Sequence, residues 1–495
     1  MKLLSFISLA TIMLALAACE TQPEAVAPTA PWIAATTTFT PGTPPPDSLV
    51  DRYRTVARTI IDYAHDDRGA YEKLSTLTTT IGHRLSGSPE LDKAIAWAAQ
   101  TMKDDGLDVH TEKVMIPHWV RGAESAAIVA SVAGTTPHPL HLIGLGGSVA
   151  TPKGGITAPL VVVHDWKELE AKGDAAKGAI VLFNTPMPPY NDTDGPGYGK
   201  AVAYRWAGPS AAAKHGAIGM LIRSVTERSL STPHTGSTGY ADGVPKIPAA
   251  ALTIEDAELL DRLSQRGPVS VHLELDEQQL PDVESANVIG DLRGSDKPDE
   301  IVVIGGHIDS WDVGQGAQDD GGGITMMMEV LRVLKQLHLQ PHRTIRAVMF
   351  VNEENGVRGG KAYAEAHKDE LAKTVMALES DSGAFAPQGF VVGHVDKDAT
   401  QRVLDRVAAI ATLLGSIRAT RVRARGETGT DVDPMKPAGV PQLGLWVDMR
   451  HYFDYHHTEA DTLDKVDPQE LADCVAAVAV LAYVVADMPD RLDSK

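Results

Sequence analysis

The second half of the chain alternates short apolar segments with longer amphipathic ones, and this pattern restricts the fold more than any other feature. Strands are expected at 301–304, 344–351, 374–378, 390–393 and 443–447. Helices are expected at 321–337, 357–367, 399–414 and 468–486. Such alternation predicts an α/β fold, with a mostly parallel mixed sheet sandwiched by helices.

The segment from about 137 to 279 has a different pattern of apolar residues. Its apolar runs are short and separated by glycine and proline, at 160–163, 179–183 and 219–222. One small helix is expected at 210–216, where a glycine can end it. We therefore expect a compact β-rich insert at 137–279. It would interrupt a larger domain formed by 48–136 and 280–488.

Residues 1–19 have the features of a signal peptide. Lys2 precedes the apolar run 3–18, which is short for a spanning helix, since that needs about 20 apolar residues. The run ends in Leu-Ala-Ala before Cys19, which resembles the lipoprotein box of bacteria. Lipidation of Cys19 is therefore expected. The alternative is an ordinary signal peptide in which the cysteine occurs by chance.

The residues after Cys19 bear on localisation. Position 20 is glutamate rather than aspartate, which by analogy with known sorting rules favours the outer membrane. Residues 20–47 are rich in proline and threonine and predict a tether. We expect export from a bacterial cytoplasm, followed by lipid anchoring in the outer membrane facing the periplasm or by secretion. Cys474 lies in an apolar helical segment, so no intramolecular disulfide is expected.

Polar side chains follow several predicted strands, at the edge where open α/β sheets build their sites. The candidates are His307, Asp319, Glu353, Glu354, Asp381, His456 and His457. A single histidine at a strand end is more often structural, and paired glutamates are common on surfaces. The repeated placement of such residues at strand ends is what indicates a site.

Nitrogen and carboxylate ligands suit Zn²⁺, with Mn²⁺ or Co²⁺ as substitutes. Asp319 is the candidate bridge between two ions, because it opens a helix behind flexible glycines. Asp309 is expected to fix the tautomer of His307, and Asp320 to give local support. Of two adjacent glutamates, one can bind metal while the other accepts a proton from metal-bound water. These residues together predict a two-metal hydrolase.

The motifs resemble the co-catalytic di-zinc exopeptidases of the secreted bacterial aminopeptidase type. The matching segments are Gly-Gly-His307-x-Asp309, Asp319-Asp320-Gly-Gly-Gly, Glu353-Glu354, Glu379-Ser-Asp381 and His457-Thr458-x-x-Asp461-Thr462. Residues 307–316 and 483–488 are similar to the carboxypeptidase Q branch of this family. The resemblance covers about 50 to 488, and the insert resembles a protease-associated domain.

The resemblance implies two zinc ions per chain. The implied ligands are His307, Asp319 and Asp381 for one ion, and Glu354, Asp319 and His457 for the other. Glu353 would be the general base and later the acid that protonates the leaving amine.

Six more residues receive expected roles. His457 is preferred over His456 as a ligand because it directly precedes Thr458, as in the family pattern. Many relatives have tyrosine at position 456, where it steadies the oxyanion, so that catalytic role is expected for His456. Thr430 and Asp431 resemble a family segment near the substrate and are expected to contact it. Arg421, Arg423 and Arg425 would share one face of a strand. They could bind a substrate carboxylate, although such runs are more often a solvated face.

The resemblance implies a secreted zinc exopeptidase acting on dipeptides or short peptides. The alternative is an aminopeptidase that removes N-terminal residues from longer peptides. A non-catalytic receptor is disfavoured because no ligand position is substituted. Nucleic acid is not an expected partner of a chain with a formal net charge of −20, and membrane contact is expected only through the N-terminal lipid. The branch often forms homodimers, but the sequence does not define the oligomeric state.

Overall fold

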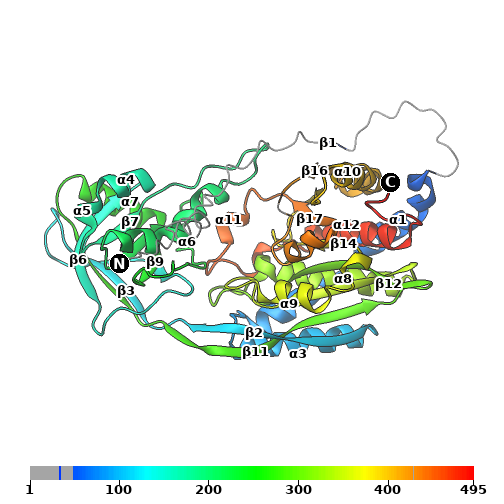
Figure 1. The fold of residues 1–495 in the computed structure, drawn as a ribbon, viewed down its shortest axis with the longest axis horizontal. Coiled ribbons are helices and arrows are strands. Elements are labelled where there is room, and N and C mark those ends of the chain that lie inside the picture. The colour runs from blue at the N-terminus through cyan, green and yellow to red at the C-terminus, as the bar shows by residue number, and fades with distance from the viewer. Residues whose placement is uncertain (1–32, 35–47, 427) are drawn as a thin grey trace, which may run out of the picture.

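The computed structural model describes residues 33–34, 48–426 and 428–495, so the predicted signal peptide, Cys19 and most of the tether lie outside it. The described chain forms two lobes (Figure 1). One is built on a nine-stranded sheet and the other on an eight-stranded sheet. We call them the nine-stranded lobe (residues 48–120 and 278–495) and the eight-stranded lobe (residues 124–275).

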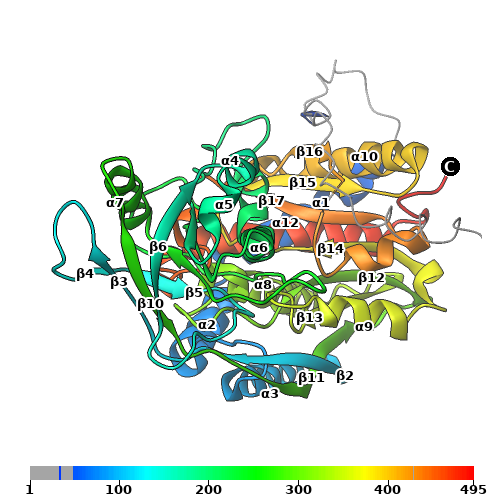
Figure 2. The ribbon, with the colours of Figure 1, turned by 60° about the vertical axis from the view of Figure 1, so that its left-hand side comes forward.

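The nine-stranded sheet is mixed, and Figure 2 shows its strands in order from β16 at the top to β2 at the bottom. In sheet order the strands are β1 (Ile33–Ala34), β16 (Arg421–Ala424), β15 (Pro387–Gly393), β17 (Gln442–Val447), β14 (Thr374–Glu379), β12 (Lys297–His307), β13 (Arg343–Phe350), β11 (Gln278–Leu292) and β2 (Asp108–Val120). The central β17, β14, β12 and β13 are parallel, whereas β11 and β15 run antiparallel to their central neighbours and β2 pairs antiparallel with β11. The predicted mixed α/β fold is confirmed, with the parallel part at its centre.

Helices cover both faces of this sheet. The longer ones are α1 (Leu49–Asp66), α2 (Gly69–Thr76), α3 (Pro89–Asp104), α8 (Gly322–Gln336), α9 (Arg358–Ala366), α10 (Lys397–Ala411) and α12 (Pro468–Asp487). The short ones are η1 (Leu77–Ile81), η2 (Ala317–Gly321), η3 (Leu371–Lys373), η4 (Thr412–Ile417), η5 (Asp433–Ala438), α11 (Tyr452–Tyr455) and η6 (Leu463–Lys465). Because strand side chains alternate, Val302 and Ile304 of β12 join the core beneath α8 and α12, while Val303 packs with Tyr363 of α9.

Helix α12 lies in the core of the nine-stranded lobe. Among the described residues it is the helix long and apolar enough to cross a membrane, but 83% of its most apolar window is buried inside the fold. The predicted core helix is therefore confirmed. Cys474 lies within it and is a buried free thiol.

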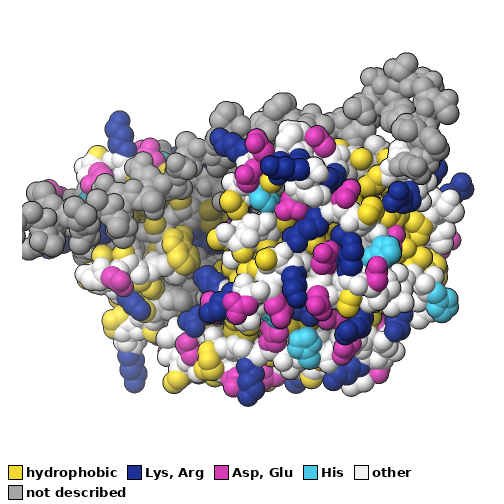
Figure 3. Space-filling view, turned by 45° about the vertical axis from the view of Figure 1, so that its right-hand side comes forward, with side chains coloured by type: hydrophobic (Ala, Val, Ile, Leu, Met, Phe, Trp, Pro, Cys, Tyr) yellow, Lys and Arg dark blue, Asp and Glu magenta, His cyan; other side chains and the backbone are white. Residues whose placement is uncertain are grey.

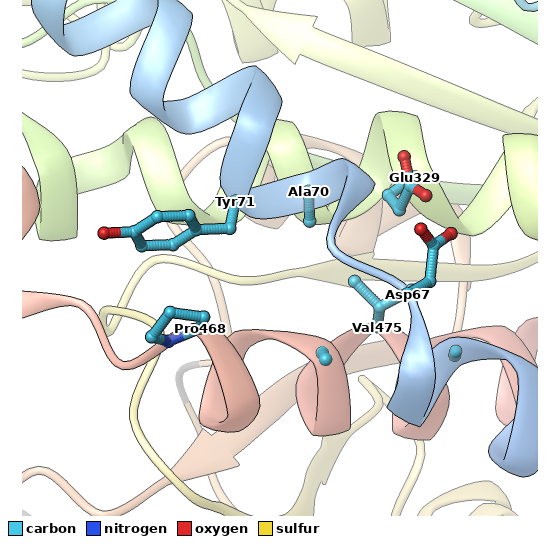
Figure 4. A pocket seen from close by; sticks show the side chains of 8 residues that line it. Asp67, Ala70, Tyr71, Glu329, Pro468 and Val475 are labelled. Atoms are coloured by element: carbon cyan, nitrogen blue, oxygen red, sulfur yellow. The ribbon is translucent and has the colours of Figure 1, made fainter.

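A partly buried ion cluster fixes α8 against α2. Lys73 of α2 lies 2.7 Å from the Glu329 carboxylate of α8, and Arg332 joins Glu329 to Asp67. Figure 4 shows Asp67 and Glu329 directed toward each other beside a cavity of about 10 Å³. Such a volume holds at most a single water molecule. This cavity is therefore part of the packing of the core.

The eight-stranded lobe is also mixed. Its strands are β3 (Glu124–Ala130), β4 (His138–Leu140), β5 (Leu142–Gly144), β6 (Ile156–Val163), β7 (Ile180–Phe183), β8 (Gly219–Arg223), β9 (Ala249–Leu252) and β10 (Ser270–Leu275). Its helices are α4 (Trp166–Ala171), α5 (Gly173–Ala176), α6 (Tyr198–Lys214) and α7 (Ile254–Ser264). Strand β3 pairs with β10, so this lobe begins before the boundary at 137 that the sequence suggested.

The ribbon of β2 and β11 and an arginine beside it join the lobes on one side. Strands β2 and β11 form a long antiparallel ribbon that leads from one lobe to the other along the bottom of Figure 1. Just beyond β2, Arg121 binds Asp312 of the nine-stranded lobe at 2.7 Å and Glu124 at 2.8 Å. On the face drawn in Figure 3, lysine and arginine side chains are interspersed with aspartate and glutamate.

Candidate metal centre

The predicted site residues converge where the central strands end. Strands β14, β12 and β13 are neighbours and parallel, so their carboxyl ends share one edge of the sheet. His307 is the last residue of β12, Glu353 and Glu354 follow β13, and Asp381 follows β14. Asp319 lies in η2, between β12 and α8.

Two groups of donor atoms share Asp319. In one, His307 Nε2 lies 3.2 Å from Asp319 Oδ1 and 3.4 Å from Asp381 Oδ1. In the other, the ligand atoms of Asp319, His456 and His457 lie within 4.8 Å of one another. Glu354 belongs beside this second group, because its Oε2 lies 3.1 Å from His457 Nε2. The structure thus brings Asp319 between two sets of partners.

Each of the two inner histidines directs Nε2 toward carboxylates. Nδ1 of His307 lies 3.1 Å from the carbonyl of Asp309, and Nδ1 of His457 lies 3.2 Å from the carbonyl of Thr235. A carbonyl only accepts, so both Nδ1 atoms carry the proton. In the neutral imidazoles, the Nε2 lone pairs then face carboxylate oxygens at 3.1–3.4 Å. A positive charge between them is needed to make this arrangement favourable.

The electrostatics of the buried site favour an added positive charge. Burial opposes a second proton on His307, but Asp381 and Asp319 outweigh it and raise its pKa well above the ordinary value. Burial raises the pKa of Asp381, and the charge of Asp319 adds to the effect. Burial and the charge of Asp319 likewise raise the pKa of Glu354.

The donor set also fits a metal ion. Asp319 Oδ2 and Glu354 Oε1 are buried oxygens with no hydrogen-bond donor among the described residues. Buried carboxylate oxygens left in this state are costly unless a cation compensates them. Two neutral imidazoles with carboxylates form a donor set of the kind that binds zinc. The side chain of Asp381 is the most open of the set, with 23% of it exposed to solvent.

The carboxylate of Asp309 does a different job from the one expected. Its Oδ1 lies 3.8 Å from His307 Nδ1, and it is the backbone carbonyl of Asp309 that the imidazole contacts. The carboxylate instead accepts the backbone N–H of Glu353 at 3.0 Å and of Glu354 at 3.4 Å. Asp309 therefore couples the β12 end to the paired glutamates.

Asp320 supports the start of α8. Its carboxylate accepts the N–H of His307 at 3.0 Å and the N–H of Gly323 at 3.1 Å. A Cβ added at Gly306 or Gly323 would lie 2.3 or 2.2 Å from this carboxylate. The glycines of the motif are needed because Asp320 approaches their backbone so closely.

Two supports were not recognised in the sequence as site residues. The fully buried Arg84 donates to the carbonyls of Ile308, Gln315 and Gly316, and so holds the loop between His307 and η2. Asp461 accepts the N–H groups of Gln318 and Asp319 at 2.7 and 3.2 Å. Asp461 stands in the His457-Thr458-x-x-Asp461 motif, which could have identified it, whereas no local signal marks Arg84.

Three residues at or near the candidate ligands have strained backbone conformations. Asn352, Val357 and His457 have positive φ values of 66°, 54° and 62° although none is glycine. The left-handed conformation costs such residues about 1–2 kcal/mol each. Asn352 and Val357 flank the paired glutamates, and His457 is itself a candidate ligand, as expected for a site where geometry outweighs local stability.

Glu353 and His456 lie beside the candidate ligands. Glu353 is half-buried. Burial raises its pKa well above the ordinary value, with His307 opposing and Asp381 adding to the effect. The ring of His456 stacks on that of His457 at 3.5 Å, and its Nε2 lies 3.7 Å from Asp319 Oδ2. Burial and His457 lower the pKa of His456 well below its ordinary value, so it is neutral.

The expected substrate segment is divided between surface and core. Thr430 is exposed, but Asp431 is fully buried and accepts the N–H of Gly360 at 3.2 Å. Its own N–H and that of Val432 donate to Glu379, at 2.8 and 3.0 Å. Asp431 thus holds backbone in place, and its burial does not fit the expected substrate contact.

Arg421, Arg423 and Arg425, in and just after β16, do not form one solvated face. Arg421 is exposed, whereas Arg423 is buried over the ring of Trp446 at 4.3 Å. Arg423 donates to the carbonyl of Thr193, and Arg425 to that of Asp194. These two arginines bind the eight-stranded lobe.

Known proteins resemble this chain over most of its length. The model of peptidase family M28 matches residues 287–482. Carboxypeptidase Q of Mus musculus is 42% identical over 448 residues, which cover 90% of this chain and 92% of that protein. The crystal structure of a peptidase M28 precursor from Shewanella amazonensis SB2B is 36% identical with a TM-score of 0.83, covering 89% of this chain and 98% of that one.

A more distant solved structure shares the fold. BSAP, a zinc aminopeptidase from Bacillus subtilis, has a TM-score of 0.61 at 22% identity and covers 86% of this chain and 96% of that one. The expected exopeptidase fold is confirmed by these likenesses. With the mouse protein matched across 92% of its length, the sequence evidence extends to both lobes. The chain therefore belongs to peptidase family M28 and is a metallopeptidase.

Proposed function

We propose that this metallopeptidase is a two-zinc exopeptidase that hydrolyses dipeptides or short peptides. The observation that carries the proposal is the position of Asp319 between two donor groups. His307 and Asp381 lie on one side of it, and Glu354 and His457 on the other. The similarity to carboxypeptidase Q over 90% of the chain supports an exopeptidase.

His457 is the better ligand of the two adjacent histidines. Its Nε2 lies 3.1 Å from Glu354 and 3.2 Å from Asp319, whereas Nε2 of His456 is 3.7 Å from Asp319. The contact of its Nδ1 with the Thr235 carbonyl also fixes the tautomer that leaves Nε2 free. We assign His457 with Glu354 to one ion, and His307 with Asp381 to the other.

When bound, zinc would polarise the scissile carbonyl and lower the pKa of the attacking water. Glu353 is the group that takes a proton from that water and later gives it to the nitrogen of the leaving amine. Its backbone is held by Asp309, and its half-buried side chain can be reached by a substrate. A positioned acid–base group of this kind contributes about 10²- to 10⁴-fold to the rate.

His456 is placed to stabilise negative charge on the carbonyl oxygen. As a neutral imidazole it can donate one hydrogen bond, and burial removes competing water. Four rings surround it, those of Tyr198, Tyr452, Phe453 and His457. This packing holds the imidazole in one orientation, which a fixed donor requires.

Replacement of Glu353 by glutamine tests the acid–base assignment. The Glu353→Gln variant should keep its zinc and lose about 10²- to 10⁴-fold in kcat on a dipeptide. Glu365→Gln, on the exposed surface of α9, is the matched control and should retain full activity. Turnover of Glu353→Gln within tenfold of the wild type would contradict the assignment.

Metal content tests the count of two. Elemental analysis of the wild-type protein should give about two zinc ions per chain. Asp319→Asn should lower the affinity for both, since Asp319 lies between the two groups. A single tightly bound ion without peptidase activity would refute the two-zinc proposal.

The aminopeptidase alternative rests on the shared fold of BSAP, a zinc aminopeptidase. A dipeptide series, chromogenic amides of single amino acids and C-terminally extended peptides would separate the two modes. Cleavage confined to dipeptides supports our proposal. Efficient stepwise release of N-terminal residues from longer peptides would favour the aminopeptidase.

We also propose that the chain is exported and anchored by a lipid on Cys19, which lies outside the described residues. Metabolic labelling with radioactive palmitate should mark the wild-type protein and leave Cys19→Ser unlabelled. Membrane fractionation would then show which membrane holds it. An unlabelled wild-type protein would instead indicate ordinary secretion.

A further inference from the structure

A loop of the eight-stranded lobe reaches into the metal centre. The backbone N–H of Thr235 donates to the carbonyl of His457 at 3.0 Å, and the carbonyl of Thr235 accepts from the His457 imidazole at 3.2 Å. One residue thus holds both the backbone and the ring of a candidate ligand. The two residues are 222 positions apart in the chain and belong to different lobes.

The same loop holds a second candidate ligand. The hydroxyl of Ser237 donates to the backbone carbonyl of Glu354 at 2.7 Å. Glu354 and His457 are the residues that we assign to one of the two ions. Both therefore take an outer contact from residues 235–237.

Arg205 of α6 holds this loop from behind. Its Nε donates to the carbonyl of Ser237 at 3.2 Å, and its Nη1 lies 3.4 Å from the carbonyl of Thr235. The guanidinium packs so tightly against Gly236 that a Cβ there would lie 2.4 Å from Arg205 Cζ. Arg205 is 7% exposed and also lies over the ring of Tyr198, at 5.6 Å. The planar, buried guanidinium donates to two carbonyls at once, and so fixes the loop more firmly than a lysine ammonium could.

The other metal position is held differently. Nδ1 of His307 is held by the carbonyl of Asp309, and its backbone N–H by Asp320. Both supports belong to the nine-stranded lobe and lie within a few residues of His307 or η2. The eight-stranded lobe therefore contacts both His457 and Glu354, whereas the contacts that hold His307 come from the nine-stranded lobe.

We propose that Arg205 is a positioning residue for the metal position formed by His457 and Glu354, acting through Thr235 and Ser237. The inference rests on the proposed two-zinc function. It makes the eight-stranded lobe a structural part of one metal position and leaves the other position independent of that lobe. Groups that orient metal ligands typically change metal affinity by about 10- to 100-fold.

Zinc binding to the full-length protein tests this inference without relying on activity. Metal-free wild type and Arg205→Met are titrated with zinc in competition with a chromophoric chelator, and with Co²⁺ to follow the absorption of each position. In Arg205→Met, one of the two affinities should fall about 10- to 100-fold, while the other stays within threefold of the wild type. The unchanged affinity shows at the same time that the variant is folded.

Two further variants sharpen the result. Arg228→Met is the matched control, because Arg228 also joins the lobes, but through Asp454 at 3.2 Å and not through residues 235–237. It should leave both affinities unchanged. Ser237→Ala removes only the hydroxyl contact to Glu354 and should weaken the same single position by a smaller factor. If Arg205→Met does not fold, Ser237→Ala decides the question.

Three outcomes would count against the inference. Unchanged binding of both ions by Arg205→Met and Ser237→Ala would overturn it. Equal weakening of both positions would also overturn it, since a general loosening would then be the cause. A wild-type protein that binds one ion only would instead refute the two-zinc proposal on which the inference rests.

Discussion

Replacement of Asp309 by asparagine should disturb the paired glutamates without removing a candidate ligand. Each oxygen of the Asp309 carboxylate accepts a different backbone N–H, that of Glu353 at 3.0 Å and that of Glu354 at 3.4 Å. Asparagine has one acceptor oxygen and one NH₂ donor. In either orientation of the amide, one backbone N–H would therefore face another donor.

The size of the effect follows from that geometry. Asp309 is fully buried, so water cannot replace the lost contact. A hydrogen bond to a charged group contributes about 1.5–3 kcal/mol. If this free energy appears entirely as misplacement of Glu353 and Glu354, kcat/KM falls about 10- to 100-fold, because about 1.4 kcal/mol corresponds to a factor of ten.

The assay compares kcat/KM on a dipeptide for Asp309→Asn and Asp256→Asn. Asp256 is also buried, but one of its oxygens accepts the single backbone N–H of His141 at 2.6 Å. An asparagine at 256 can rotate and keep that bond, so this control should lose less than threefold. A loss below threefold for Asp309→Asn, or equal losses in the two variants, would refute the reasoning.

Two other predictions concern stability. Arg84→Met leaves buried carbonyls without a donor and should lower the free energy of unfolding in urea by about 3–5 kcal/mol, whereas exposed Arg54→Met should change it by less than about 0.5 kcal/mol. Burial, with Glu124 and Asp276 adding and Arg121 opposing, raises the pKa of Glu277 to about 7. The folded protein therefore binds the proton of Glu277 more tightly than the unfolded chain does. The free energy of unfolding accordingly falls as pH rises from about 4.5 to about 7. Glu277→Gln should remove that loss. The melting temperature of the wild type, relative to that of the variant, should therefore be lower at pH 8 than at pH 5. The same difference at both pH values would contradict the assignment.

The sequence was sufficient to locate the candidate ligands because their positions depend on local rules. A residue that follows a parallel strand lies at the carboxyl edge of the sheet, whatever the rest of the chain does. His307, Asp381 and the glutamates after β13 could therefore be grouped before any contact was known. Asp319 followed from the glycines around it, which Asp320 needs for its close approach.

The boundaries of the eight-stranded lobe could not be read as reliably. Strand β3 carries several alanines, with weak apolar contrast, and was not recognised, so the lobe seemed to start at 137. In place of α6, only a small helix at 210–216 was predicted, with a glycine to end it. In the structure Pro209 lies inside α6, which begins at Tyr198. The first residues of β11 are exposed and polar, so they lacked the periodicity of a half-buried strand.

The groups that orient the ligands were beyond any local rule. Arg84 contacts Ile308 across 224 positions, and Thr235 contacts His457 across 222. Each bond joins a side chain to a backbone carbonyl. Because every residue has such a carbonyl, the sequence does not indicate which one accepts the bond. Such contacts arise only once two distant segments have folded against each other. The candidate ligands can therefore be predicted from one sequence, whereas the contacts that orient them depend on the packing of distant segments, and for His457 and Glu354 also on the docking of the second lobe.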